Sequence, residues 1–173
     1  EIAFEGLPCM GHDLKIGRGL GDVIMPILIT IEHNLLIEPD IGSVEMPSLR
    51  TIGHDFKIAQ SRQSGDVPRI SLNALLTIGH DLKVEKVEGL TNLSFPDLMS
   101  IAGDYRVIGT TDLNAFDAPN LLSIVSDLTI ESNVALHSFA MGGLLGVRNV
   151  TIRDNPELCE GIPDAFIEGL GDG

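Results

Sequence analysis

Hydrophobic and polar positions along the chain recur in a unit of about 22 residues. The phrase Thr-Ile-Gly-His-Asp-Phe-Lys-Ile at 51–58 returns with two conservative changes at 77–84, and a close copy occupies 10–16. The longest unit carries extra polar residues at 60–66, which we expect to form an outward loop. Successive Asp or Asn landmarks lie 21, 21, 26, 23, 23 and 22 residues apart; they are Asp13, Asn34, Asp55, Asp81, Asp104, Asp127 and Asn149. Such a fixed period indicates a repeat protein.

Each unit contains three short apolar segments separated by polar residues. Around Asp127 these segments are 121–124, 128–130 and 136–139. Each is too short for a helix, and the middle one shows the in-out-in alternation of a strand. Prolines, which lack a backbone donor and suit corners, recur near the unit boundaries; they are Pro26, Pro47, Pro68, Pro96 and Pro119. The pattern predicts an all-β, parallel β-solenoid of about seven coils stacked ~4.8 Å apart.

The pattern predicts a single solenoid domain over residues 1–173, with coils at about 10–158 and a cap at about 159–173. Pro163 and Asp164 suit the first turn of a helix. An apolar helix face would follow from four residues: Ala165, Phe166, Ile167 and Leu170. We therefore expect a short C-terminal helix that closes the last coil, and no comparable cap before Met10.

The amino-acid composition limits which classes of molecule the protein could bind. Hydrophobic residues make up 43% of the chain but aromatic residues only 4%, which predicts a largely aliphatic core. The formal net charge of -14 would repel nucleic acids and anionic membrane surfaces. No apolar run approaches the ~20 residues of a membrane span, so we expect no direct membrane insertion.

In the strand after each landmark, the alternation of side chains predicts two inward positions with one outward position between them. The inward set includes Leu14, Phe56, Leu82, Tyr105 and Leu128, with Ile16, Ile58, Val84, Val107 and Ile130. The outward column is Lys15, Leu36, Lys57, Lys83, Arg106, Thr129 and Thr151. A third column follows, formed by Gly17, Glu38, Ala59, Glu85, Ile108, Glu131 and Arg153.

The charged members of these columns are the candidate ligand-binding residues. They are Lys15, Lys57, Lys83 and Arg106, with Asp55, Asp81 and Asp104 beside them. Alternatively, stacked Asp and Lys form a self-compensating ladder in which each exposed pair contributes roughly 0–1 kcal/mol.

A histidine precedes the landmark in four consecutive units, as His12, His33, His54 and His80. Equivalent residues stack in a solenoid, so these imidazoles are expected to be neighbours, and their protonation near pH ~6 would cost repulsion. Imidazoles beside Asp could bind Zn²⁺ or Cu²⁺. We favour a structural role, with no metal and no cofactor. Because the His-Asp pair is repeated, and no Gly-x-Ser-x-Gly sequence is present, we expect no catalytic residues.

The two cysteines fall in the first and last units. Six coils at the sheet spacing place Cys9 and Cys159 ~29 Å apart, whereas a disulfide requires Cα atoms within ~7 Å. An intrachain disulfide is therefore predicted to be absent.

The repeat resembles the receptor L-domain type of leucine-rich repeat. The resemblance is carried by residues 121–133, by 136–139 and by the Asn-Pro-Glu-Leu-Cys sequence at 155–159 before the expected helix. Similar units form the ligand-binding L domains of insulin- and EGF-receptor ectodomains and occur in fungal cell-wall and bacterial surface proteins. The resemblance implies a right-handed solenoid, extracellular or cell-surface placement and recognition of a protein or glycan. The family often has Gly or Asn where this chain has the four histidines.

The sequence thus predicts a non-enzymatic binding or adhesion module that recognises a protein or glycan. Two alternatives stay open. Exposed strands at the end of a solenoid invite pairing with another chain, so the protein could self-assemble end to end. A carbohydrate-active β-helix enzyme would need clustered acids and sugar-stacking aromatics, which one Tyr and no Trp make scarce.

Overall fold

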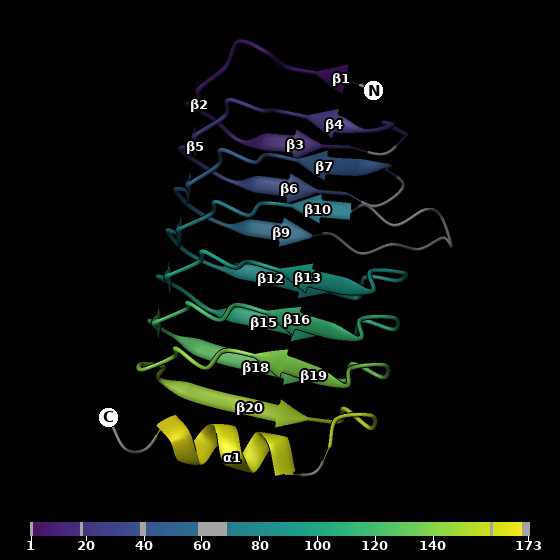
Figure 1. Cartoon of the computed structure of the whole chain (residues 1–173), viewed down its shortest axis with the longest axis vertical. Coiled ribbons are helices and arrows are strands. Elements are labelled where there is room, and N and C mark those ends of the chain that lie inside the picture. The colour runs from purple at the N-terminus through teal and green to yellow at the C-terminus, as the bar shows by residue number, and fades with distance from the viewer. Residues whose placement is uncertain (1, 18, 39–40, 59–68, 160, 171–173) are drawn as a thin grey trace.

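The computed structural model describes residues 2–17, 19–38, 41–58, 69–159 and 161–170. The chain winds into a parallel β-solenoid of about six turns of about 23 residues, followed by one short helix (Figure 1). This confirms the predicted architecture. The turn count is one below the predicted seven, because seven stacked copies of a strand are separated by six steps. The expected loop at 60–66 lies outside the described residues.

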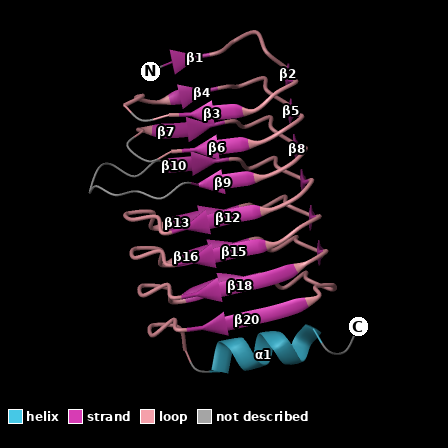
Figure 2. Ribbon diagram, turned by 180° about the vertical axis from the view of Figure 1, so that it is seen from behind, coloured by secondary structure: helices cyan, strands magenta, loops and turns pink. Residues whose placement is uncertain are grey.

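Two sheets run along most of the solenoid, and each strand pairs with its counterparts in adjacent coils. The longest, sheet C, has seven strands: β3 (Leu14–Ile16), β6 (Leu35–Ile37), β9 (Phe56–Ile58), β12 (Leu82–Glu85), β15 (Tyr105–Ile108), β18 (Asp127–Glu131) and β20 (Asn149–Arg153). Sheet B has six two-residue strands: β2 (Cys9–Met10), β5 (Thr30–Ile31), β8 (Thr51–Ile52), β11 (Thr77–Ile78), β14 (Ser100–Ile101) and β17 (Ser123–Ile124). Figure 2 shows this ladder-like stacking from behind.

The third strand of each coil belongs to one of two separate sheets, depending on the position of the coil along the solenoid. Sheet A serves the early coils with β1 (Ile2–Ala3), β4 (Val23–Ile24), β7 (Ser43–Glu45) and β10 (Arg69–Ser71). Sheet D serves the later coils with β13 (Asn92–Ser94), β16 (Ala115–Asp117) and β19 (Ser138–Ala140). Where β10 gives way to β13, the surface is hollowed by about 530 Å³ and lined by residues that include Arg69 and Asn92.

The core is one continuous stack of buried side chains from Leu14 to Leu144. The predicted inward residues of sheet C are all buried. The core is mainly aliphatic, as predicted, but its largest fully buried side chains are aromatic. Phe56, Phe95, Tyr105 and Phe116 are each no more than 1% exposed. The in-out alternation of the sequence therefore sets which residues pack inside.

The corners between sheets explain the positions of proline and glycine. Pro26, Pro47, Pro96 and Pro119 lie in the turns that lead into sheet B. At the next corner, leading into sheet C, the coils approach so closely that a Cβ added at Gly79 would overlap the carbonyl oxygen of Gly53. Gly53 makes the same close approach to the Glu32 carbonyl oxygen, so these two coils need glycine here, whereas Glu32 and Ala102 occupy the equivalent place in other coils.

A buried polar ladder fixes the loops that follow sheet C. The Asn133 side chain is fully buried, and its Oδ1 accepts hydrogen bonds from the backbone N–H of Thr110 at 3.0 Å and from its hydroxyl at 2.7 Å. Its amide nitrogen donates to the Val107 carbonyl at 2.9 Å and to Asn155 Oδ1 at 3.1 Å. One side chain thus ties together three successive coils.

The C-terminal helix α1 (Gly161–Leu170) lies across the end of the core, which confirms the predicted cap. The Phe166 ring meets the Phe139 ring edge-on at a centroid distance of 5.1 Å, and Leu170 is also partly buried. The prediction for Ile167 was wrong, because this side chain is 46% exposed. The side chains of Pro163, Asp164 and Ala165 lie outside the description. No helix in the described ranges has the length and apolar character of a membrane span.

Candidate binding face on sheet C

The outward column of sheet C has the predicted register, but it brings together only part of the candidate site. Lys83 pairs with Lys57 on one side and with Arg106 on the other. Lys15 pairs with Leu36, which separates it from Lys57. The contiguous cationic column therefore spans three coils, and Lys15 lies two coils from it.

The Asp/Asn column forms the corner that leads into sheet C, and its members hydrogen-bond to the backbone of the next coil. Asn34 Oδ1 accepts the backbone N–H of Asp55 at 3.0 Å, and Asp55 Oδ1 accepts that of Asp81 at 3.1 Å. Asp81 Oδ1 accepts the N–H of Asp104 at 2.8 Å. The position of this column beside the lysines agrees with the prediction from the sequence, whereas its backbone contacts were not predicted. Asn34 can take the place that Asp occupies in most coils because both side chains offer the same acceptor oxygen.

The second carboxylate oxygen of each Asp is free to pair with a cation, and two of the expected ion pairs form. Lys83 Nζ lies 2.6 Å from Asp81 Oδ2, and Arg106 lies 2.6 Å from Asp104 Oδ2. Lys15 instead pairs with Glu38 of the third column at 2.7 Å. Lys57 is exposed and makes no ion pair with a described residue. Part of the column is thus the self-compensating ladder that was the alternative prediction.

The ion pair between Asp81 and Lys83 is the most buried one on this face, with side-chain exposures of 10% and 23%. The hydrogen bond to Asp81 raises the pKa of Lys83 above its usual value. Burial raises the pKa of Asp81, but the hydrogen bonds from Lys83 and the Asp104 amide outweigh it, and the net shift is downward. Both groups therefore stay charged near neutral pH.

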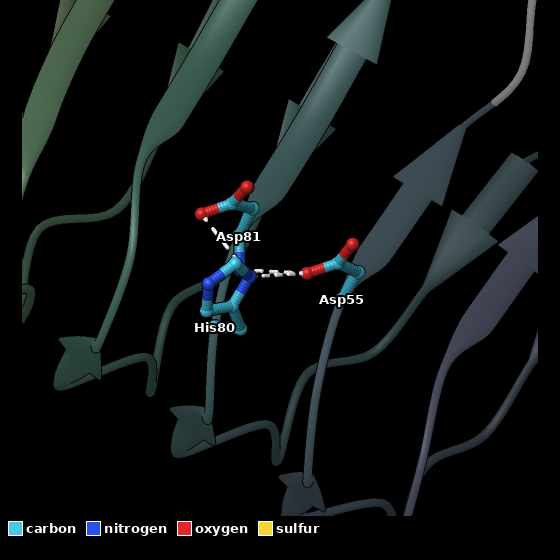
Figure 3. A group of neighbouring side chains, drawn as sticks. All are labelled: Asp55, His80 and Asp81. Atoms are coloured by element: carbon cyan, nitrogen blue, oxygen red, sulfur yellow. Dashed lines mark hydrogen bonds and ion pairs between the residues drawn. The ribbon is translucent and has the colours of Figure 1, made fainter.

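The four histidines divide into a stack and one separate residue. The rings of His33 and His54 stack with a centroid distance of 5.3 Å and an interplanar angle of 8°, and His12 lies 6.2 Å from His33 in a tilted arrangement. His80 instead places Nδ1 2.7 Å from Asp55 Oδ1 and 3.5 Å from Asp81 Oδ1 (Figure 3). The predicted column of neighbouring imidazoles is thus formed by three histidines, and the fourth contacts carboxylates.

The contacts of His80 set the charge of this cluster. The hydrogen bond to Asp55 and the charge of Asp81 raise the pKa of His80. Burial raises the pKa of Asp55, but the hydrogen bonds from His80 and the Asp81 amide outweigh it, so its pKa is lowered. His80 and Asp55 form a polarised pair in which Nδ1–H donates to the carboxylate.

A shallow groove of about 250 Å³ crosses the first three strands of sheet C. It contains three of the predicted binding residues, Lys15, Lys57 and Asp55, and lies beside Lys83 in the next coil. The remaining lining comprises Asp13, Leu14, Asn34, Leu35 and Leu36. Leu36 was not predicted as a site residue, although its apolar character in an otherwise cationic column was the signal for it.

Both cysteines are free and exposed. Cys9 lies in β2 of the first coil and Cys159 just before α1, so they sit at opposite ends of the solenoid, as the repeat predicted (Figure 1).

No protein-family model, curated protein or solved structure matches the chain.

Proposed function

We propose that this solenoid is a non-catalytic binding module that holds a protein or glycan ligand against the outward face of sheet C. The observation that carries the proposal is the groove over β3, β6 and β9, in which an apolar Leu36 lies among two lysines and two aspartates. Mixed apolar and charged lining of this kind suits a ligand with hydroxyl, amide or carboxylate groups around an apolar part.

The rigidity of the face supports the same proposal. The backbone of Leu36 and Lys57 is fixed by strand pairing with the coils before and after it, and that of Lys15 by pairing with β6. A ligand would therefore meet a preorganised backbone and cause little loss of loop entropy. In a chain of net charge -14, the exposed Lys57 also provides a local cationic contact for an acidic group on the ligand.

The resemblance to receptor L-domain repeats adds the expected setting. The β-solenoid and its terminal helix agree with that resemblance at the level of architecture. We infer from the repeat motifs that the module belongs to the receptor L-domain class and acts outside the cell or on its surface.

A binding screen tests this function. Arrays of glycans and of extracellular proteins would be probed with the wild-type chain and with a Lys57→Glu, Leu36→Asp variant. An Arg148→Glu variant is the matched control, because Arg148 is an exposed cation away from the groove. We expect a ligand that the groove variant loses and the control retains. Equal loss in both variants, or equal retention, would refute the groove as the binding site.

The catalytic alternative receives little support from the aromatic residues. Sugar-cleaving enzymes stack substrates on exposed rings, whereas Phe56, Phe95, Tyr105 and Phe116 are all buried here. The ring of Phe4 is exposed, but it does not line the groove. Incubation with polysaccharides followed by a reducing-end assay would detect such an activity. End-to-end self-assembly is a further proposal, and light scattering over a range of concentrations would detect it.

A further inference from the structure

We propose that Asp55, His80 and Asp81 form a binding site for a divalent transition-metal ion such as Zn²⁺. The site lies at the corner that leads into β9 and β12, and it shares Asp55 with the groove of the proposed function. It would use one atom from each residue: Asp55 Oδ1, His80 Nδ1 and Asp81 Oδ1.

The spacing of these atoms fits a small cation. The ligand atoms of the three residues all lie within 4.8 Å of one another. Zinc bonds of ~2.0–2.2 Å at tetrahedral angles place neighbouring ligand atoms about 3.3 Å apart. His80 Nδ1 is 3.5 Å from Asp81 Oδ1 and 2.7 Å from Asp55 Oδ1. A bound ion would replace the proton that His80 now donates to Asp55, and the imidazole would move outward by a fraction of an ångström.

The two carboxylates are already fixed in position by the backbone. Asp55 Oδ1 accepts the Asp81 N–H, and Asp81 Oδ1 accepts the Asp104 N–H at 2.8 Å. Hydrogen bonds of this kind orient metal ligands and raise affinity. Only His80 needs to adjust, and with 61% of its side chain exposed it is free to do so.

The neighbouring coils show why the site would form at this coil. Towards the N-terminus, the stacked rings of His33 and His54 face each other rather than a pair of carboxylates. In the following coil the histidine position is taken by Gly103, and a Cβ there would overlap Asp81 Oδ1. The combination of one imidazole and two carboxylates therefore occurs where the histidine series ends.

Lys83 gives the proposal a distinctive prediction. Its ammonium group lies 2.6 Å from Asp81 Oδ2 and 4.0 Å from Asp55 Oδ2, so its charge opposes a cation at the Oδ1 atoms. Replacing Lys83 by Gln removes this repulsion while keeping a polar side chain. Metal affinity should then increase, an effect that a destabilised or misfolded variant would not produce.

Calorimetric titration of the metal-free protein with ZnCl₂ tests the site. Because the exposed thiols could also bind zinc, every variant would carry Cys9→Ser and Cys159→Ser. The ligand variants are His80→Asn and Asp55→Asn. Asp55→Asn should preserve the fold, because Asn34 makes the equivalent backbone hydrogen bond in the previous coil.

We expect one zinc ion to bind per chain. Either ligand variant should lower the zinc affinity by more than about tenfold, since even the loss of a residue that only hydrogen-bonds to a metal ligand lowers affinity by that much. Lys83→Gln should strengthen binding by roughly 1.4-fold to fivefold, the range of a partly exposed charge pair. The control, His54→Asn, should leave the affinity unchanged. Loss of binding in His54→Asn but not in His80→Asn would place the ion on the imidazole stack and overturn the proposal. Weaker binding in Lys83→Gln, or no zinc binding at all, would overturn it as well.

Discussion

Replacing Tyr105 by Phe should stabilise the protein, because its hydroxyl group is buried without a hydrogen-bond partner. Tyr105 lies in β15 with its side chain in the core and 0% exposed. Among the described residues its hydroxyl oxygen meets no partner. Burial and the charge of Asp117 raise the pKa of Tyr105, so the hydroxyl stays protonated at all pH values of interest.

The magnitude follows from the energy of unmet hydrogen bonds. A buried polar group without a partner costs about 1–3 kcal/mol. Removing the oxygen recovers this energy, less a small term for the cavity of one atom. We expect a net gain of about 1 kcal/mol, which raises the midpoint of thermal unfolding by about 2–4 °C in a chain of this length.

The same column of inward residues supplies a reciprocal control. Phe56 occupies the equivalent position two coils earlier, pairing through Leu82 with Tyr105, and it is also 0% exposed. Phe56→Tyr would add a buried hydroxyl and should lower the midpoint. Thermal melts followed by circular dichroism would compare both variants with the wild type under one set of conditions. A lower midpoint for Tyr105→Phe would refute the reasoning, since it would mean that the hydroxyl makes a favourable interaction.

Three further predictions follow from the coil contacts. Asn133→Ala should lower the free energy of unfolding by about 2–4 kcal/mol in urea titrations, because it leaves buried backbone groups unpaired; an unchanged midpoint would contradict this. Gly79→Ala should lower the free energy of unfolding by about 1–3 kcal/mol, because its Cβ would overlap the carbonyl of Gly53. A thermal melt of the variant that matches that of the wild type would contradict this. The raised pKa of His80 means that its bond to Asp55 stabilises fully below pH ~6.5 and is lost as pH rises through the folded value. With a metal chelator present, the difference in melting midpoint between wild type and His80→Asn should therefore shrink as the pH rises from 5.5 to 8. A difference that grows with pH would contradict this contribution of His80.

The register of the solenoid could be predicted from the sequence because each repeat carries its own alternation. Leu82, Lys83 and Val84 read in, out, in, and the structure buries the first and third of them. A slip of one residue would move the charged side chain into the core, so few alternatives compete. The repeat spacing also predicted that the two cysteines lie far apart. The terminal helix was predicted from a different signal, Pro163 and Asp164 followed by apolar residues at helical spacing.

The contacts of individual side chains could not be predicted in this way. The repeat places His54 and His80 at equivalent positions, yet one stacks on an imidazole and the other binds a carboxylate. This choice depends on a balance of contacts that each contribute little energy at an exposed corner. The exposure of Ile167 could not be predicted either, because the angle at which a short helix lies decides which of its faces meets the core.

The hydrogen bonds that join the Asp/Asn column have a consequence for how such a chain changes length. Five of the six junctions join a backbone N–H to the Oδ1 atom of the preceding Asp or Asn, as Asn34 to Asp55 and Asp81 to Asp104 show. At the last junction the Asn149 side-chain amide donates to Asp127 instead. Duplicating or deleting one whole coil in the middle would recreate the junction that it interrupts. The length of the rod can therefore drift over evolutionary time in steps of one repeat without disturbing its ends.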